Sequence, residues 1–202
     1  EIFFPEKRLL FLENSDLFSN IGNSRIRPFF SRRIGNVDKM PVPVLFGARM
    51  SGNIDKNWRF GLMTIQTKDK TSLDEPSNNY SVASVQRKVF NSSSISAFVI
   101  NRQAFQDFYS YDNNVNRIAG LEYDLRSKNS KWNGKAFFHH AFTPENYKKA
   151  NAYSLKMRYR TAAKTLFVGV DHVDQDFVTD VGFVPRLYHT NEDSDSTIRV
   201  GY

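Results

Sequence analysis

The feature that most constrains this chain is a period of two in hydrophobicity that recurs along most of its length. From 119 to 126, for example, apolar residues alternate with charged or small ones, as in a strand with one apolar and one polar face. Eight such runs are predicted as strands, at residues 42–52, 58–69, 79–90, 93–105, 114–128, 131–143, 151–162 and 165–176. Each run is roughly ten to fifteen residues long, whereas a typical soluble strand has about five or six. The chain is therefore predicted to be all-β.

The connections between these runs alternate between short and long. Residues 53–57, 91–92, 128–130 and 163–164 form short connections, and residues 70–78, 106–113 and 144–150 form longer ones. Tight periplasmic turns and longer external loops alternate in this way in outer-membrane barrels. A Greek-key sandwich has long crossovers in a less regular order. We therefore predict an antiparallel, up-and-down, transmembrane β-barrel of the outer-membrane type.

This topology sets the predicted layout of the chain. An additional strand is expected at residues 27–35, paired with 42–52, and residues 1–26 are predicted to be a periplasmic or lumenal entry segment. Residues 27–202 then supply about ten barrel strands. Because residues 197–202 read as a strand that stops midway, the barrel is expected to be incomplete here and to continue beyond residue 202.

The polar face of these strands carries most of the charge. A sheet in lipid must close, with its apolar face toward lipid and its charged face toward the lumen. The residues predicted to form a lumen-facing charged ladder are Arg49, Glu122, Asp124, Arg126, Lys156, Arg158, Arg160 and Asp171. In a soluble sandwich the same residues would be the solvated face of a sheet.

Four aromatic residues lie near predicted strand ends: Trp58, Tyr80, Trp132 and Tyr153. Amphipathic rings favour the headgroup region of a membrane, so these residues are candidates for an interfacial girdle. Ordinary packing within a sheet is the alternative explanation.

Groups suited to catalysis are few. Glu122 and Asp124 share a strand face, as the paired carboxylates of a glycoside hydrolase would require. Basic residues nearby in the pattern favour a salt-bridged ladder instead. No GxSxG, phosphate-binding loop or HExxH motif occurs. We therefore predict no enzymatic activity and no cofactor.

Metal sites are not expected either. His139 and His140 are adjacent on a strand and point to opposite faces, so they cannot readily share one ion. His172 and Asp174 share a face but lack an evident third ligand. Residues 69–79 lack the ligand spacing of a calcium loop.

Composition restricts the partners. The chain of 202 residues has a net charge of +7 and a pI of about 9.6, but its basic residues are scattered among acidic ones, so no nucleic-acid partner is expected. It has no cysteine, which excludes disulfides and thiolate metal sites. The expected partners are outer-membrane lipid, other envelope proteins, and a glycan or small solute.

Several short motifs together resemble one family. The opening of the chain contains the family-motif residues Phe4, Pro5, Glu6, Lys7 and Arg8, and residues 31–35 contain Arg32 and Arg33. With residues 79–82 and 181–184, these resemble a family of Bacteroidota envelope proteins. In that family a periplasmic domain similar to family 9 carbohydrate-binding modules precedes a C-terminal domain of unknown function, thought to be a β-barrel. Leu9 and Asn14 depart from the family's usual Pro and Gly, which leaves the turn geometry of the entry segment open.

The resemblance implies that this chain starts the C-terminal barrel domain and that it resides in the bacterial outer membrane. It supplies no reaction that can be assigned to particular residues. Two classes of function remain open. One is an outer-membrane barrel for nutrient or glycan uptake, or for scaffolding an envelope complex. The other is a soluble β-sandwich acting as a carbohydrate-binding module or a carbohydrate-active enzyme.

Overall fold

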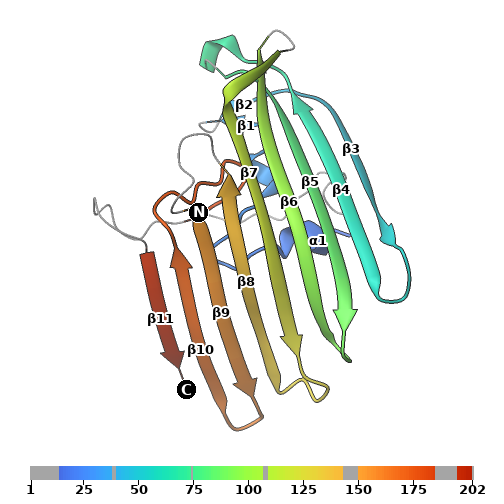
Figure 1. The fold of residues 1–202 in the computed structure, drawn as a ribbon, viewed down its shortest axis with the longest axis vertical. Helices are drawn as coiled ribbons and strands as arrows, with labels where there is room; N and C mark the ends of the chain where they lie inside the picture. Colours follow the sequence, from blue (N-terminus) through green and yellow to red (C-terminus); the bar gives the residue numbers. More distant parts are fainter. Residues whose placement is uncertain are drawn as a thin grey trace.

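The computed structural model describes residues 14–37, 40–73, 75–106, 109–142, 150–184 and 195–201, with the backbone alone at 106, 109–114 and 195–201. Its main element is an antiparallel sheet of nine strands, each paired with its neighbours in sequence (Figure 1). These strands are β3 (Val44–Asn53), β4 (Trp58–Thr67), β5 (Ser77–Val89), β6 (Ser93–Gln106), β7 (Tyr109–Arg126), β8 (Trp132–Phe142), β9 (Asn151–Arg160), β10 (Thr165–Val173) and β11 (Asp195–Gly201). The other described elements are the pair β1 (Asn36–Val37) and β2 (Met40–Pro41), helix α1 (Asp16–Ser19), and the 3-10 helices η2 (Ser31–Arg33) and η3 (Thr71–Leu73).

The prediction of an all-β chain with consecutive antiparallel strands is confirmed. All eight predicted runs correspond to strands β3 to β10, and the strand-like end of the chain corresponds to β11. The sheet is nevertheless open: within the described residues, β3 pairs only with β4, and β11 only with β10. A closed barrel is therefore not seen.

The strand predicted at residues 27–35 is wrong. Arg27 forms an isolated bridge with Phe183, and Ser31–Arg33 is the 3-10 helix η2. Pro28 has no amide hydrogen for a ladder, and the segment lacks strict alternation. Phe29 is buried in the hydrophobic core instead. The segment therefore lies on the sheet rather than in it, and the sheet begins at β3.

The long connection predicted at residues 106–113 is also wrong. β6 runs to residue 106 and β7 begins at residue 109, with Gln106 opposite Tyr109. The polar residues 112–114 read as a loop, but they lie within β7, at an irregularity of its pairing with β6 between Gln103 and Phe105. These two strands extend past the others at the end of the sheet opposite the short turns (Figure 1).

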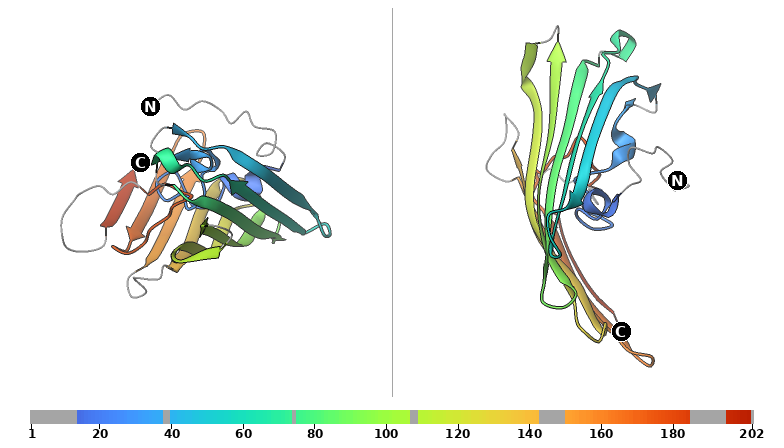
Figure 2. Two further views of the ribbon diagram at one scale, coloured as in Figure 1. Left: turned by 90° about the horizontal axis from the view of Figure 1, so that it is seen from above. Right: turned by 90° about the vertical axis from the view of Figure 1, so that its right-hand side faces the viewer.

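One face of the sheet is covered by the chain itself. We call residues 14–37 and 174–184 the cover; the former run along one side of the curved sheet (Figure 2). The two parts of the cover bind each other, because Phe30 donates to the Val181 carbonyl at 2.8 Å and Thr179 donates to the Pro28 carbonyl at 2.9 Å. No helix among the residues described is long and apolar enough to cross a membrane.

The hydrophobic core lies between the cover and this face. The cover contributes Leu17, Phe18, Ile21, Ile26, Phe29, Ile34, Phe177 and Val181, and the strands contribute Met63, Ile65, Tyr80, Val82, Phe98, Ile100, Ile118 and Phe137 among others. We call this the covered face and the opposite one the open face.

Candidate functional site

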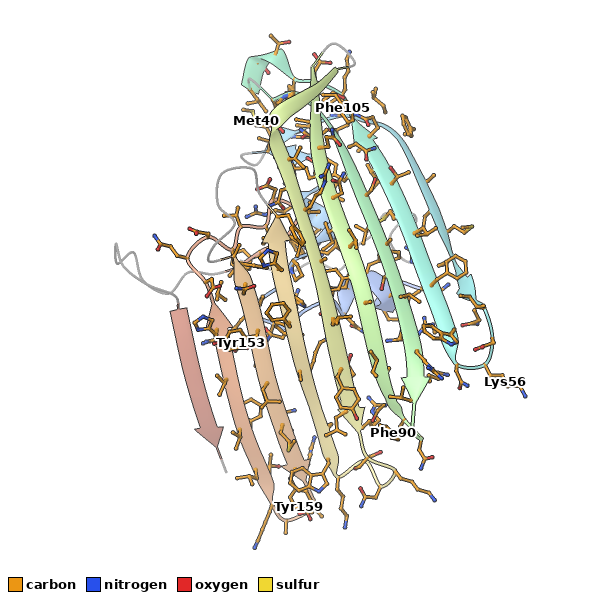
Figure 3. The ribbon with its side chains drawn as sticks, viewed as in Figure 1. Met40, Lys56, Phe90, Phe105, Tyr153 and Tyr159 are labelled. Atoms are coloured by element: carbon orange, nitrogen blue, oxygen red, sulfur yellow. The ribbon has the colours of Figure 1, made fainter. Side chains whose placement is uncertain are left out.

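The open face carries large apolar side chains that are left exposed. Examples on every strand from β3 to β10 except β5 are Met50, Leu62, Ile95, Val99, Leu121, Trp132, Phe138, Phe142, Tyr153, Leu155, Met157, Leu166 and Val168. Leu121, on the central strand β7, is 61% exposed. Figure 3 shows that side chains of the open face, including Tyr153 and Tyr159, are distributed over the length of the strands. Such a continuous surface exceeds the isolated apolar residues that are normal on a soluble protein.

This apolar surface has a polar border near the end with the longer connections. Thr64, Ser81, Asn101 and Arg117 are consecutive cross-strand neighbours on β4 to β7. Thr64 and Ser81 hydroxyls are 3.2 Å apart, and Arg117 Nε donates to Asn101 Oδ1 at 2.8 Å. The polar side chains thus satisfy one another along a row.

An aromatic border marks the end with the short turns. The Arg87 guanidinium lies 5.2 Å from the centre of the Trp58 ring. Farther along the sheet, Trp132 packs on Tyr159 with ring centres 4.8 Å apart. On β4 to β7 the apolar surface is therefore a band between a polar row and an aromatic row, while Phe46 on β3 and Phe142 on β8 are exposed at or beyond the level of the polar row. Along the open face of β7, the stretch from Arg117 to Leu125 spans roughly 27 Å.

Both borders run obliquely to the strands. Direct cross-strand partners of Trp58 can be followed from β4 across to β8. On β8, Trp132 lies four residues from the partner position, so the aromatic border is displaced by four residues over these strands. The same procedure carries the position of Thr64 on β4 across to β10. His172, the polar residue of the open face on β10, lies four residues from that position, displaced in the same direction as the aromatic border. At about 3.3 Å per residue and about 4.8 Å per strand, these shifts correspond to a strand tilt of roughly 25–35° relative to the band.

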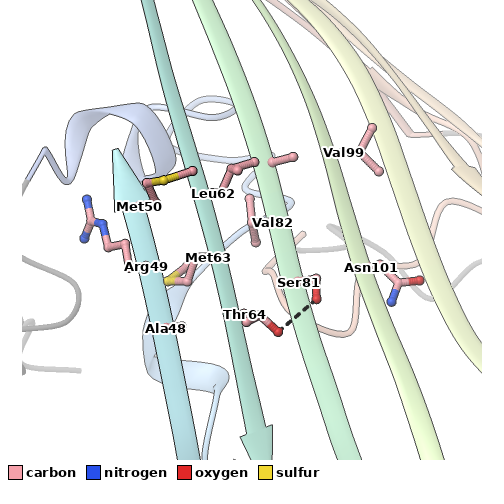
Figure 4. Close-up of a pocket in the computed structure, with 11 residues that line it drawn as sticks. Ala48, Arg49, Met50, Leu62, Met63, Thr64, Ser81, Val82, Val99 and Asn101 are labelled. Carbon is pink, nitrogen blue, oxygen red and sulfur yellow. Dashed lines mark hydrogen bonds between the residues drawn. The ribbon is translucent and has the colours of Figure 1, made fainter. Parts of the chain in front are cut away.

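A shallow hollow of about 380 Å³ lies within the band (Figure 4). Small side chains at Ala48 and Ala83 leave space between the larger Met50, Leu62 and Val99. The hollow is almost entirely apolar and ends at the hydrogen-bonded pair of the polar border. It is a local irregularity of the apolar band, and the charged residue in its lining, Arg49, belongs to the covered face by strand alternation.

The covered face carries the predicted charged ladder. Strand alternation puts all eight ladder residues on this face: Arg49, Glu122, Asp124, Arg126, Lys156, Arg158, Arg160 and Asp171. Glu122 and Asp171 are buried beneath the cover, whereas Arg126, Arg158 and Arg160 are exposed near the short turns. Whether this face lines a lumen stays a prediction.

Glu122 binds the cover at its turn. Its Oε1 accepts hydrogen bonds from the Gly22 amide at 2.6 Å and from His139 Nε2 at 2.9 Å. Its Oε2 lies 2.7 Å from Lys135 Nζ, and this ammonium also donates to the Asn20 carbonyl. Gly22 has a φ of +78°, and a Cβ there would lie 1.9 Å from the Ile26 carbonyl oxygen. Only glycine fits this turn.

A second buried contact lies beside the first. Asp171 Oδ2 forms an ion pair of 2.8 Å with Lys156 Nζ across β9 and β10. Its Oδ1 accepts a hydrogen bond from Asn23 Nδ2 at 2.8 Å, and this amide also donates to Ser154 Oγ at 3.1 Å. The Asn23 side-chain oxygen accepts from the Arg25 and Ile26 amides and fixes the local turn. The cover is thus attached to both carboxylates.

Replacing Asn23 by alanine should lower the free energy of unfolding by about 2 kcal/mol, because several partly buried hydrogen bonds are lost together. Denaturant titration of the folded chain measures the change. Asn20→Ala is the matched control, since Asn20 is exposed and binds Lys135 through its carbonyl alone. Its substitution should change the free energy by less than about 0.5 kcal/mol. Equal effects of the two substitutions would contradict the role given to Asn23.

Helix α1 is attached by cationic side chains of the first strands. Asp16 accepts hydrogen bonds from both terminal nitrogens of Arg59, at 2.7 and 3.0 Å. This hydrogen bond holds the pKa of the Asp16 carboxyl below its usual value of 3.8. The Arg49 guanidinium lies 4.8 Å from the centre of the Phe18 ring. The start of the cover is therefore held at β3 and β4.

The Asp16 contact should make stability depend on acid pH. Since the folded pKa lies below the unfolded one, the contribution is present above about pH 4 and is lost as the pH falls through the folded pKa. Asp16→Asn should therefore cost up to about 1 kcal/mol near pH 6 and less near pH 3, where protonation of the carboxyl has begun to remove the contribution. Denaturant titrations at the two pH values measure this. A cost independent of pH would show that the charge of Asp16 is not responsible.

Several residues that hold the cover on the sheet were not predicted from the sequence. Gly22 and Asn23 lie in a segment without periodicity, and no signal placed them opposite Glu122. Lys135 is not among the residues predicted to form the ladder. His139 is fully buried between Phe98 and Phe137, with ring centres 4.9 and 4.2 Å away.

Other predicted residues lie elsewhere. Tyr80 is buried on the covered face, so its assignment to an interfacial girdle is wrong. Arg32 and Arg33 belong to the short helix η2 of the cover. The motif residues Phe4, Pro5, Glu6, Lys7 and Arg8 lie outside the described residues.

The other two histidines that the structure describes make local contacts. His140 Nδ1 lies 2.8 Å from Asn151 Oδ1, and His172 Nε2 lies 2.9 Å from Asp174 Oδ1. In the described part of the chain, no group of three His, Asp or Glu side chains is placed to hold a metal ion. Comparisons of the chain with models of known protein families, with curated proteins and with solved structures give no match.

Proposed function

We propose that this chain forms part of the wall of a bacterial outer-membrane β-barrel that acts as a membrane-embedded scaffold for an envelope complex. The observation that carries the proposal is the apolar band of the open face, with its polar border on one side and its aromatic border on the other. Transmembrane barrels have an apolar outer band about 25 Å tall with aromatic girdles at the interfaces. Roughly 27 Å along a strand, tilted by roughly 30°, gives a band of about 23 Å.

The strand geometry supports the same conclusion. The oblique borders correspond to a tilt close to the 35–45° of membrane barrels. The consecutive antiparallel order from β3 to β11 is the order of an up-and-down barrel. In lipid, the edges of β3 and β11 would have to be paired by strands of this chain or of another. The resemblance of the opening motif to Bacteroidota envelope proteins agrees with this location.

The cover favours a scaffold over an open pore. Together with the strands it buries nineteen hydrophobic residues among those that the structure describes, and it binds both Glu122 and Asp171. A water-filled channel requires a polar, unobstructed interior. Uptake of a nutrient or glycan through this part of the barrel would require the cover to move away from the sheet.

Extraction of the native protein tests the membrane location. We expect the folded protein to need detergent for extraction, and to run differently on a gel when unheated and when boiled. Solubility without detergent and identical mobility would overturn the location and favour the soluble sandwich. Planar-bilayer recordings test the scaffold role: we expect no steady open-pore current, and a steady current would favour uptake instead.

A further inference from the structure

A cavity of about 600 Å³ lies between the covered face and the turn of the cover at residues 19–24. The strands β7, β8 and β9 supply its wall close to their short turns. Its charged lining residues are Arg27, Asp124, Arg126, Lys135, Lys156 and Arg158. Five cationic side chains thus share the cavity with one carboxylate, and the cavity is suited to an anion.

Four of these cations occupy two adjacent rows of the sheet. Arg126, Asn133 and Arg158 are direct cross-strand neighbours in one row. Lys135 and Lys156 are direct neighbours in the next row. Like charges directly opposite one another destabilise a sheet. The concentration of positive charge here is therefore unfavourable unless something negative compensates it.

The positive charges of the two lysines are compensated by carboxylates of the chain itself. They form ion pairs of 2.7 and 2.8 Å with the buried carboxylates of Glu122 and Asp171. Among the described residues, no carboxylate lies within 4.0 Å of the guanidinium of Arg126 or Arg158. Asp124 lines the same cavity and interacts with the charge of Arg126 at longer range, so the two arginines hold most of the positive charge that is not in an ion pair.

The geometry of the arginine row suits a ligand with two anionic groups. Arg126 and Arg158 are separated by two strand spacings, or roughly 10 Å between their Cα atoms, and the Asn133 amide stands between them. The Arg158 guanidinium lies 5.5 Å from the centre of the Phe167 ring, which restricts its orientation. A guanidinium binds phosphate oxygens in a two-pronged manner.

We propose that this cavity binds a phosphorylated small molecule through Arg126 and Arg158, with a diphosphate as the simplest ligand that both can reach. Asn133 donates a further hydrogen bond between them, and the paired lysines contribute positive potential behind. The proposal goes beyond the scaffold function and does not depend on it, because the cavity belongs to the covered face and not to the apolar band.

Equilibrium dialysis of the folded full chain against labelled inorganic diphosphate tests the site. We expect saturable binding by the unaltered protein, and roughly tenfold weaker binding for Arg126→Gln and for Arg158→Gln. Arg87→Gln is the control, because it removes one positive charge from the open face beside Trp58. It should change the dissociation constant less than about twofold. Absence of saturable binding, or equal weakening by all three substitutions, would overturn the proposal.

A chemical experiment avoids any effect of substitution on folding. Phenylglyoxal modifies accessible arginines, and mass spectrometry locates the modified residues. Inorganic diphosphate should slow the modification of Arg126 and Arg158 several-fold while leaving that of Arg87 unchanged. If diphosphate protects all three arginines equally from phenylglyoxal, or protects none of them, the ligand does not bind in this cavity.

Discussion

Replacing Leu121 by arginine should lower the free energy of unfolding in lipid vesicles by about 2–4 kcal/mol. Leu121 is 61% exposed at mid-height of the apolar band on the central strand β7. If the open face contacts lipid, the guanidinium must leave water for hydrocarbon. If the open face contacts water, the same substitution is a surface change that costs less than about 0.5 kcal/mol. The size of the loss in the free energy of unfolding therefore shows whether the open face contacts lipid or water.

Asn101→Arg is the matched control for this measurement. Asn101 lies on the open face of the adjacent strand β6, in the polar border. Arginine near the membrane interface costs only about 0–1 kcal/mol. Denaturant titrations in vesicles give both free energies. Losses of similar size for Leu121→Arg and Asn101→Arg would be incompatible with a band of lipid contact between the two borders.

The strands and their two faces could be predicted because each is encoded locally. A period of two fixes which side of a strand is apolar, and that pattern extends over ten or more residues in most strands. Leu121 and Glu122 were accordingly assigned to opposite faces, and the structure places one exposed and the other buried. The parity of a single residue at a strand end is less secure, as the buried Tyr80 shows.

The cover could not be predicted because its position depends on long-range contacts. Gly22 binds Glu122 across 100 residues of sequence, and Asn23 binds Asp171 across 148. Neither contact leaves a periodic signal in residues 14–37. Basic and aromatic residues at 27–35 are compatible with a strand, and only the core contacts of residues such as Phe29 decide against it. Tertiary packing overrides local preference in such a segment.

Glu122→Gln should lower the free energy of unfolding by about 3 kcal/mol or more. The carboxylate is 4% exposed and is shared among the Gly22 amide, His139 and Lys135. Removing its charge leaves the ammonium of Lys135 with the Asn20 carbonyl and with Asp124, at 3.6 Å, as its one remaining carboxylate among the described residues. Breaking one side of a buried ion pair is costly because the other charge is then less well compensated. The loss should appear in denaturant titrations of the folded chain.

Asp124→Asn provides the comparison within the same strand and on the same face. The Asp124 side chain is 42% exposed and lies 3.6 Å from the same ammonium. Its neutralisation should cost less than about 1 kcal/mol, as for exposed ion pairs. Amide hydrogen exchange gives a second readout, because the neutral amide oxygen of glutamine is a weaker acceptor than the carboxylate and should speed exchange at Gly22 in Glu122→Gln but not in Asp124→Asn. If Gly22 exchanges equally slowly in both variants, Glu122 does not hold the cover on the sheet.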